Sequence, residues 1–371
     1  MDLNIVTLNI PYPPDYGGMI DTFYRIKWLT AAGVRIHLHC FEYGRSRSEE
    51  LESLCESVNY YQRKTGVLNH LSGIPYIIKS RNSVKLLEKL KTNDFPILFD
   101  GLHTTYFLNQ PDLSSRNIFV RLHNIEHFYY RSLADNEQNL FKKLYYIIEA
   151  KKLQKYETLL KGSVNYFTIS QGDHNYFSSI CQNVIYLSPF HPYEKITSKP
   201  GKGNYILYHG DLSVNENLVT AESLITNVFN ELPYDCIIAG KNPPARLQAI
   251  ATGRSNIRIV SNPEGDEMKR LIRDAQINLT PAMTSNGFKM KLLIALFSGR
   301  HCLVNNLAVE NFPDRTIFHL AETHKEIIDK INYLMNEEFT GEMISDRIRI
   351  LKEEYSNQAN TRKLINLVFN I

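Results

Sequence analysis

A chain of 371 residues is longer than one ordinary domain, so we expect two domains. Its composition, 43% hydrophobic and 22% charged, is typical of a globular protein with sizeable cores. The formal net charge of +3 is too small to indicate a polyanion, and we expect no nucleic acid among its partners.

The five cysteines lie far apart, and no pair has the spacing of metal ligands or of a redox motif. We therefore expect buried free thiols in a reducing compartment, and no metal site. Residues 1–10 pass from an acid directly into a strand-like run, which is not the pattern of a signal peptide. No apolar run approaches the ~18 residues that span a bilayer. The sequence predicts a cytoplasmic protein.

The first half alternates short apolar strands with amphipathic helical stretches. Strands are expected at 3–9, 34–40, 96–100, 117–123 and 165–170. This alternation predicts a parallel sheet covered by helices on both faces. We assign residues 1–190 to a first Rossmann-like domain.

Residues 188–203 are rich in Pro, Gly, Ser and Lys and have no periodicity, so 191–203 is assigned as the linker. The strand–helix alternation then resumes, with strands expected at 204–210, 234–240, 256–260, 276–281 and 300–306. Residues 204–356 are assigned to a second doubly wound domain, and the tail from 322 onward is expected to be helical. Two such domains joined by a hinge would form a ligand-binding cleft.

The motifs of common nucleotide-binding domains are absent. No G-x-G-x-x-G follows the first strand, and the chain holds no G-x-x-x-x-G-K-[ST] P-loop. His37 and His39 share one side of a strand and are interpreted as ordinary strand residues.

The loop after the first strand ends in Gly17 and Gly18, followed by an amphipathic helix. Bare backbone N–H groups at a helix start favour a negatively charged ligand. A glycine pair that serves only a tight turn would have the same spacing, so both interpretations stay open.

Polar residues follow the strand that ends at Leu122, in the run "HNIEH". Because the carboxyl ends of parallel strands face the cleft, His123, Asn124, Glu126 and His127 are candidates for binding hydroxyl groups. A structural histidine is the alternative.

The run "TSNGFKMKLLIALFSG" places Gly287 in a turn and two lysines, Lys289 and Lys291, at the start of a helix. Turn N–H groups, the positive end of the helix dipole and two ammonium groups together favour a phosphate, and a diphosphate most naturally. Solvated lysines are the alternative. Glycines end two earlier strands of this half, at Gly210 and Gly240, where we expect strand-to-helix turns.

The second half resembles the donor-binding domain of GT-B glycosyltransferases, in the large retaining group called family 4. The order of "NYILYHGDLSVNENL", "IIAGKNPPARLQAI" and the segment 256–306 carries this resemblance. The last motif matches a branch that reads G-x-R-x-K-x-x-E-A-x-x-x-G. The first half resembles the family more loosely, through Gly17-Gly18, His123 and "FTISQGD". The resemblance implies an α/β fold of two Rossmann-like doubly wound domains facing each other across a cleft. It also implies that the C-terminal helix, 357–371, joins the first domain.

The resemblance also implies residue roles. His123 would touch the transferred sugar, and Lys289 and Lys291 would neutralise the diphosphate in place of a metal ion. Asn124, Glu126 and His127 would contact the acceptor. The expected donor-binding residues are Gly17, Gly18, Gly210, Asp211, Gly240, Lys241, Val260, Ser261, Asn262, Asn286, Gly287, Phe288 and Glu310.

Two positions depart from the family pattern. Lys289 stands where the branch has arginine, which keeps the charge and loses the bidentate fork. Ile294 stands where the family has a glutamate that binds the ribose, and isoleucine makes no hydrogen bond. Losing such a contact costs about 1–3 kcal/mol of donor binding. Glu310, or Glu264 and Asp266, are candidates to replace it.

The segment 141–162 carries several lysines among leucine, isoleucine and tyrosine. A basic amphipathic helix of this kind suits either an anionic membrane surface or the outside of a domain. A peripheral position on the inner face of the cell membrane is therefore an expectation that the structure can address.

The resemblance implies a retaining, metal-independent glycosyltransferase that uses a nucleotide-diphosphate sugar as co-substrate, has no cofactor, and acts on a glycan or lipid-linked acceptor. Its place would be in polysaccharide or glycoconjugate biosynthesis. The main alternative, motivated by Ile294, is a GT-B-shaped partner or scaffold protein without transfer activity. A sugar-nucleotide epimerase of the same fold would need catalytic carboxylates that the sequence does not place.

Overall fold

The computed structural model describes residues 1–160, 164–284, 287–312 and 314–371. The chain divides into two compact units. The first consists of Met1–Pro192, residues 287–288 and Tyr355–Ile371, and the second of residues 193–284 and Lys289–Glu354. Asn286, one of the expected donor-binding residues, lies outside the described residues.

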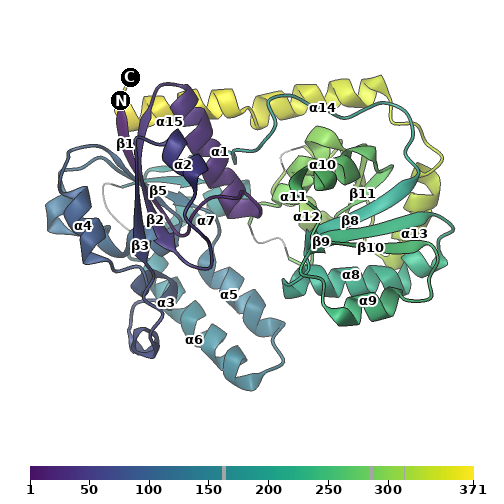
Figure 1. Cartoon of the computed structure of the whole chain (residues 1–371), viewed down its shortest axis with the longest axis horizontal. Helices are drawn as coiled ribbons and strands as arrows, with labels where there is room; N and C mark the ends of the chain where they lie inside the picture. Colours follow the sequence, from purple (N-terminus) through teal and green to yellow (C-terminus); the bar gives the residue numbers. More distant parts are fainter. Residues whose placement is uncertain (161–163, 285–286, 313) are drawn as a thin grey trace. The chain divides into compact units, whose positions relative to one another are not determined.

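The first unit is built on a seven-stranded sheet with the order β3-β2-β1-β4-β5-β6-β7 among its described residues (Figure 1). All six pairings are parallel, as the alternation of strands and helices predicted. The strands are β1 (Asp2–Thr7), β2 (Arg35–Glu42), β3 (Ser57–Gln62), β4 (Ile97–Asp100), β5 (Ile118–Leu122), β6 (Asn165–Thr168) and β7 (Val184–Tyr186).

Helices cover both faces of this sheet because successive strand side chains point to opposite sides. Ile5 packs on one face with Phe23 of α1 and Leu364 of α15. Val6 packs on the other with Phe177 of α7. The helices are α1 (Gly17–Ala31), α2 (Glu49–Leu54), α3 (Tyr76–Lys79), α4 (Val84–Leu90), α5 (Glu126–Asp135), α6 (Leu140–Glu157), α7 (Gln171–Ile180) and α15 (Asn357–Phe369), with short 3-10 turns η1 (Val67–Leu71), η2 (Leu102–Phe107) and η3 (Pro111–Leu113).

The second unit holds a six-stranded parallel sheet with the order β10-β9-β8-β11-β12-β13 among its described residues. Its core joins Tyr208, Ile238 and Leu279 to the helices on one face. The elements are β8 (Tyr205–Asp211), α8 (Asn215–Asn227), η4 (Phe229–Glu231), β9 (Asp235–Lys241), α9 (Ala245–Ala251), β10 (Ile257–Ser261), α10 (Gly265–Asp274), β11 (Ile277–Leu279), α11 (Met290–Ser298), β12 (His301–Val304), α12 (Asn306–Val309), β13 (His319–Leu320), α13 (His324–Leu334) and α14 (Gly341–Glu354).

The expected turn positions of Gly210 and Gly240 are wrong. Both glycines lie inside strands, in β8 and β9, and they face each other in the ladder. A Cβ atom on Gly240 would lie 1.9 Å from the carbonyl oxygen of Gly210. The two strands thus approach so closely at their carboxyl ends that Gly240 tolerates no side chain.

Each sheet reverses its winding direction once. The chain proceeds from β1 to β2 and β3 on one side, and then returns to place β4 on the other side of β1. It repeats this path with β8, β9 and β10, followed by β11 beside β8. Ligands of open parallel sheets bind outside the carboxyl ends of the strands at such reversal points.

Candidate active site

In the first unit, His123 follows β5 and lies against the last residue of β4. Its Nε2 is 3.0 Å from Oδ1 of Asp100. Asp100 also accepts hydrogen bonds from Thr22 and Arg25, both on α1. Burial alone would raise the pKa of Asp100, but Arg25 and His123 outweigh it and hold that pKa well below its usual range. The Nδ1 atom of His123 is buried and has no hydrogen-bond partner among the described residues.

A second buried carboxylate, Asp21, locks α1 onto the sheet. Arg121 of β5 donates to both of its oxygens, over 2.9 Å from Nε and 2.7 Å from Nη2. Arg25 donates to it over 2.7 Å, and the backbone N–H of Phe190 over 2.8 Å. Burial would raise the pKa of Asp21, yet Arg121 and Arg25 lower it below its ordinary value. The network fixes the direction of α1 relative to β4 and β5.

Three of these groups meet a geometric condition for holding a cation. Ligand atoms of Asp21, Asp100 and His123 lie within 4.8 Å of one another. Arg25 donates to both carboxylates and so supplies positive charge at the same place. The arrangement is that of a buried ion-pair network that positions His123.

Gly17 and Gly18 are the first residues of α1. The residue before them, Tyr16, makes no side-chain cap hydrogen bond to the first turn. A Cβ atom on Gly18 would lie 3.8 Å from the Tyr16 ring, an ordinary contact, so packing does not demand glycine there. The uncapped helix start leaves backbone N–H groups available for an anion.

The predicted acceptor residues take different positions. The His127 ring binds Glu157 of α6, with 2.5 Å between Nδ1 and Oε2, and joins α5 to α6. Glu126 is buried, and this burial, with Glu157 and Asp173 nearby, raises its pKa to about 8. Glu126 is therefore protonated at neutral pH and available as a donor. Asn124 is half-buried and interacts with Glu126.

In the second unit, Lys291 lies in the first turn of α11. Its Nζ donates to Oδ1 of Asn217 over 3.3 Å and lies 5.2 Å from the centre of the Tyr208 ring. Burial lowers its pKa to about 8; Glu216 raises it and Lys289 lowers it further. Lys289 is the N-cap residue of α11, and burial lowers its pKa as well. Two partly desolvated ammonium groups thus lie at one helix start.

A carboxylate that the sequence did not single out accompanies the lysines. Glu216 lies in the first turn of α8, and its Oε1 accepts a hydrogen bond from the Met283 N–H over 3.2 Å. Its charge favours the protonated forms of both lysines. Glu216 stands in the run "DLSVNENL", which begins at the last residue of β8. No local sequence pattern connects this glutamate with the start of α11, some 75 residues later.

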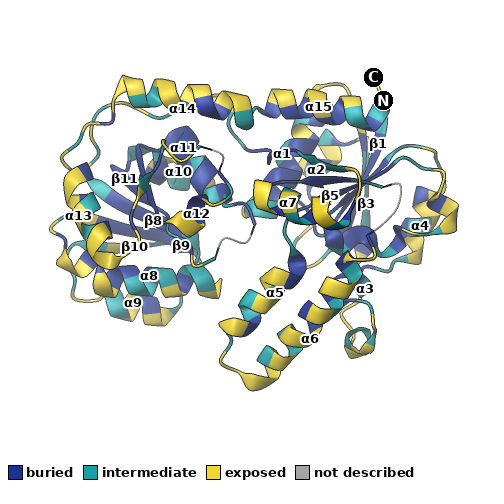
Figure 2. Ribbon diagram, turned by 180° about the vertical axis from the view of Figure 1, so that it is seen from behind, coloured by how far each residue is buried: buried dark blue, intermediate teal, exposed yellow. Residues whose placement is uncertain are grey.

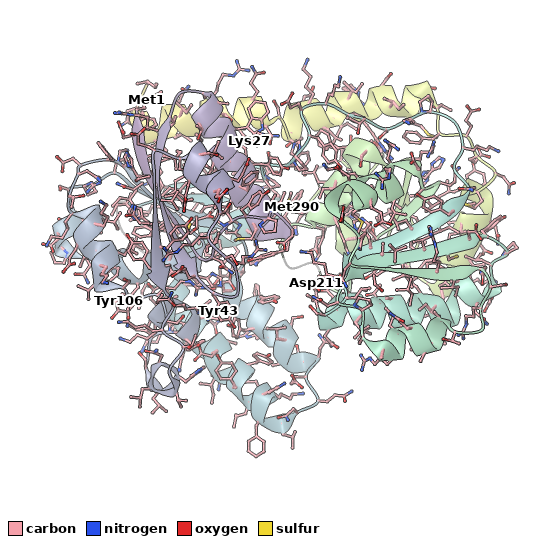
Figure 3. The ribbon with its side chains drawn as sticks, in the orientation of Figure 1. Met1, Lys27, Tyr43, Tyr106, Asp211 and Met290 are labelled. Carbon is pink, nitrogen blue, oxygen red and sulfur yellow. The ribbon has the colours of Figure 1, made fainter. Side chains whose placement is uncertain are left out.

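The remaining donor-binding candidates line the carboxyl edge of the second sheet. Asp211, labelled in Figure 3, ends β8 and accepts hydrogen bonds from the backbone and hydroxyl of Ser213. Lys241 ends β9. Asn262 adopts a left-handed conformation, with φ of 52°, and accepts a hydrogen bond from the Asn242 N–H over 2.8 Å.

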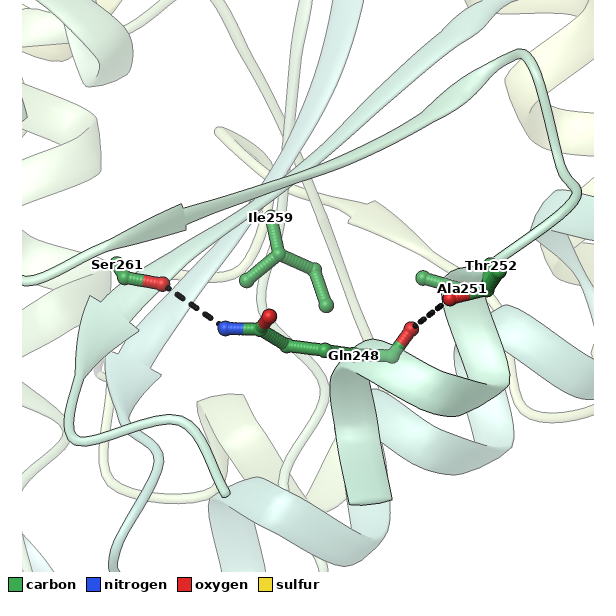
Figure 4. A pocket seen from close by; sticks show the side chains of 5 residues that line it. All are labelled: Gln248, Ala251, Thr252, Ile259 and Ser261. Carbon is green, nitrogen blue, oxygen red and sulfur yellow. Dashed lines mark hydrogen bonds between the residues drawn. The ribbon is translucent and has the colours of Figure 1, made fainter. Parts of the chain in front are cut away.

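Ser261, at the end of β10, lines an open depression of about 380 Å³ together with residues of α9. Figure 4 shows Gln248 reaching Ser261, with 3.5 Å between Nε2 and Oγ. Val260 precedes it and is half-buried. Glu310 is exposed at the end of α12. Gly287, with φ of 66°, and Phe288 belong to the first unit.

No family model matches the chain. A Klebsiella pneumoniae protein, described as an uncharacterized 44.6 kDa protein in the cps region, is 21% identical over 392 residues. The aligned region covers 98% of this chain and 98% of that protein. Solved structures resemble the chain over nearly its full length. Staphylococcus aureus TarM, determined with fondaparinux, α-GlcNAc-glycerol and UDP, has a TM-score of 0.70 at 11% identity and 99% coverage of each chain. Anabaena HepE, determined with UDP and glucose, has a TM-score of 0.68 at 10% identity and 100% coverage of each.

Sucrose-phosphate synthase of Thermosynechococcus elongatus has a TM-score of 0.63 at 12% identity, with 100% of this chain and 96% of that one covered. At these identities the similarity establishes the fold. The chain has the two-domain GT-B fold with Rossmann-like parallel sheets, which confirms the predicted architecture.

Proposed function

We propose that this protein is a glycosyltransferase that moves a sugar from a nucleotide-diphosphate sugar to a glycan or lipid-linked acceptor. The observation that carries the proposal is the pair Lys289 and Lys291 at the start of α11, on the carboxyl side of the second sheet. Burial lowers the pKa of both ammonium groups, to about 8 for Lys291, so a bound anion would favour their charged forms. A diphosphate would supply that charge and accept their hydrogen bonds.

Support comes from the structural neighbours. TarM was determined with UDP and HepE with UDP and glucose, so nucleotide-diphosphate ligands occur on this fold. The switch-point edge of the second sheet is where such a fold would hold a nucleotide. Ser261 and the depression beside it are candidates for contacting the nucleoside.

The proposed reaction retains the anomeric configuration and requires no metal ion. The bond between the anomeric carbon and the diphosphate oxygen breaks, and a bond from that carbon to an acceptor oxygen forms on the same face. The acceptor proton passes to the leaving diphosphate. Lys291 and Lys289 stabilise the charge on that diphosphate. His123, held by Asp100, contacts the transferred sugar through its unpaired Nδ1.

Contact with an anionic membrane surface forms part of the proposal. On α6, Leu140, Phe141, Leu144, Ile147 and Ile148 are exposed, Phe141 to 87%. Figure 2 shows the exposed faces of α5 and α6. Both carboxylates of α6 are buried and bonded, Glu149 to Tyr76 and Glu157 to His127, so its exposed charges are lysines. An apolar stripe with positive charge fits anionic lipid. No described helix is long and apolar enough to cross a bilayer.

A vesicle co-sedimentation assay tests this contact. Wild type is expected to bind phosphatidylglycerol vesicles and to release them at high salt, because screening weakens the attraction. Phe141→Ser with Leu144→Ser should bind several-fold less, while Leu307→Ser, an exposed apolar residue of the second unit, should bind like wild type. Self-association of wild type through this surface, without vesicle binding, would contradict the membrane contact.

Transfer is tested by incubating the protein with UDP-, GDP-, ADP- and CMP-linked sugars and following nucleotide release. Turnover with one donor is expected, and Lys291→Ala should reduce it at least about a hundredfold if the charge is used in the transition state. Lys330→Ala, a lysine that also lies over a tyrosine ring in the second unit, is the matched control. Unchanged turnover in Lys291→Ala would refute the phosphate role.

The alternative is a partner or scaffold protein without transfer activity, and Ile294 is the residue that favours it. Ile294 is half-buried and offers no hydrogen bond to a ribose. Binding calorimetry with the same nucleotides separates the two functions. A protein that binds none of them at millimolar concentration would be a scaffold.

A further inference from the structure

Two arginines of the first unit, Arg63 and Arg81, have no carboxylate partner among the residues that the structure describes. Arg63 follows β3, and Arg81 follows the turn after α3. Arg81 is only 3% exposed. Neither residue takes part in an ion pair within the described part of the chain, whereas the buried Arg25 and Arg121 each bind a carboxylate. Burial of a guanidinium without a counter-charge leaves its desolvation uncompensated. Arg347 of the second unit, 2% exposed, is also without an ion pair among the described residues, but backbone carbonyls surround its guanidinium.

Hydrogen bonds to backbone and hydroxyl groups hold both guanidinium groups at one place. The Nε of Arg81 donates to the carbonyl of Leu8 over 3.0 Å, and its Nη1 donates to Ile77. The Nε of Arg63 donates to Oγ of Ser80 over 3.1 Å. Leu8 directly follows β1, so Arg81 lies at the carboxyl end of the strand where the first sheet reverses its winding.

Two histidines lie near Gly101, in the surroundings of Arg81. A Cβ atom on Gly101 would lie 3.2 Å from the Leu8 side chain, 3.4 Å from Nδ1 of His103 and 3.7 Å from Cδ2 of His123. The Leu8 side chain, His103 and His123 thus all lie beside Gly101, and the charge of Arg81 acts on His103. The Nδ1 atoms of both histidines are buried without a hydrogen-bond partner among the described residues.

The charges at this point do not balance. Burial lowers the pKa of Arg81 to about 9, and the neighbouring Arg63 lowers it further. Burial and the charge of Arg81 lower the pKa of His103 well below its usual value. The Glu126 carboxyl group lies 3.9 Å from Nδ1 of His103, and its pKa of about 8 means that it carries little negative charge at neutral pH. Asp100 also acts on His103, but it is bound to Arg25 and His123, so the charges of Arg63 and Arg81 have no paired carboxylate among the described residues.

We propose that Arg63 and Arg81 bind a phosphate or diphosphate group of the acceptor. This inference rests on the proposed function and specifies its acceptor as a phosphorylated one. A guanidinium fork matches phosphate oxygens in a bidentate manner and supplies the charge that a phosphate needs in a desolvated place. The buried Nδ1 of His103 can donate to such a ligand in the neutral Nδ1–H tautomer of the ring.

A continuous series of rings leads from this site to the apolar surface of α6. The Arg63 guanidinium lies 4.3 Å from the centre of the Tyr43 ring and 5.2 Å from that of Tyr76. The Tyr76 ring stacks on His70 at 3.8 Å, and His70 meets Tyr145 of α6 at 5.4 Å.

The 3-10 turn η1 that carries His70 exposes Val67, Leu68 and Leu71, to 78%, 81% and 79%. Figure 1 labels α6, which belongs to the first unit. A lipid that carries the phosphate would find apolar surface directly beside the arginines.

Calorimetric titration with three probes tests the site and its source. Farnesyl diphosphate carries both an apolar chain and the diphosphate, inorganic pyrophosphate carries only the charge, and farnesol carries only the chain. Wild type is expected to bind farnesyl diphosphate and not farnesol. Tighter binding of farnesyl diphosphate than of pyrophosphate indicates a lipid-linked acceptor, and equal binding indicates a soluble phosphorylated one.

Variants locate the site. Arg63→Gln should weaken farnesyl diphosphate binding about tenfold to a hundredfold, as loss of a charge-assisted hydrogen bond predicts. Arg81→Lys, which keeps the charge and loses the fork, should weaken it about tenfold. Arg47→Gln is the matched control, because Arg47 is 64% exposed and already paired with Glu42. If Arg81→Lys does not fold, Arg63→Gln decides.

The donor site provides the final control. Arg63→Gln should bind UDP like wild type, and Lys291→Ala should bind farnesyl diphosphate like wild type. The proposal is overturned if wild type binds none of the phosphate probes, if Arg63→Gln binds them unchanged, or if Lys291→Ala removes their binding. Absence of UDP binding with intact farnesyl diphosphate binding would refute the proposed donor and leave this site in place.

Discussion

The carboxyl edges of the two sheets handle buried charge in different ways. In the first unit, Asp21 and Asp100 are each bound by guanidinium groups, and the carboxylates keep lowered pKa values despite complete burial. In the second unit, Lys291 has an amide, a ring and a nearby carboxylate, and its pKa falls to about 8.

We infer that the paired charges of the first unit stabilise the fold, whereas the partly paired charge of Lys291 is available to bind an anionic ligand. A fully bonded network holds α1 on its sheet, so removing one member should cost stability. A partly bonded lysine carries a desolvation cost that a bound anion would remove, so replacing it should cost affinity and not stability. The predictions below test that distinction, beginning with the largest expected effect.

Asp100→Ala should lower the free energy of unfolding by about 3–5 kcal/mol, because Arg25 loses one of its two carboxylate partners while remaining buried, and Thr22 and His123 lose their shared acceptor. Urea denaturation measures the change. Asp266→Ala removes an exposed ion pair with Lys269 on the surface of α10 and should cause no measurable loss. If the two variants lose equally little, the first-unit network does not stabilise the fold.

Lys291→Met should separate affinity from stability. Affinity for the bound nucleotide should fall about tenfold to a hundredfold, because a charge-assisted contact to the diphosphate is lost. The free energy of unfolding should rise by about 1–2 kcal/mol at pH 7, because an ammonium with a lowered pKa no longer has to be buried.

The sign follows from the pKa. The cost of burying Lys291 is present below its folded value of about 8 and disappears as the pH rises toward its ordinary value of 10.5, so the advantage of Lys291→Met should vanish there. Lys330→Met, the matched control, should leave both quantities unchanged. If Lys291→Met loses stability and keeps its affinity for the nucleotide, Lys291 stabilises the fold and does not bind the diphosphate.

Glu126→Gln should remove a pH dependence of stability of the first unit. The Glu126 pKa is raised from 4.5 to about 8, so wild type is destabilised progressively as the pH rises through that interval. Relative to wild type, Glu126→Gln should gain about 3–5 kcal/mol between pH 4.5 and pH 8, since each unit of raised pKa is about 1.4 kcal/mol. Denaturation at both pH values is the measurement, with the exposed Glu342→Gln as control. Equal pH profiles for Glu126→Gln and wild type would show that Glu126 ionises normally.

The fold and half of the second-unit site follow from local sequence patterns. Alternating apolar strands and helices predict both parallel sheets, and "NGFKMK" predicts the two lysines at the start of α11. The sequence predicts a turn at Gly240, because a glycine that follows an apolar run usually ends a strand. Its true constraint comes from Gly210 on the adjacent strand, which no local pattern contains.

The remaining site depends on distant pairs. Arg121 and Asp21 are 100 residues apart, and Lys291 and Asn217 are 74 apart. Residue type alone does not distinguish Arg121, which is bonded to a carboxylate, from Arg81, which is not. Only the three-dimensional arrangement shows which buried arginine has a carboxylate partner. The proposed phosphate site rests on that difference.

The most direct test of the account is the pKa of Lys291, measured by NMR of the lysine Cε with and without a nucleoside diphosphate such as UDP. In the free protein we predict a value near 8, and on binding a rise toward the ordinary 10.5, because the diphosphate supplies the missing counter-charge. Binding of the nucleotide without any change in the pKa of Lys291 would show that the diphosphate lies elsewhere, and would contradict the proposed site.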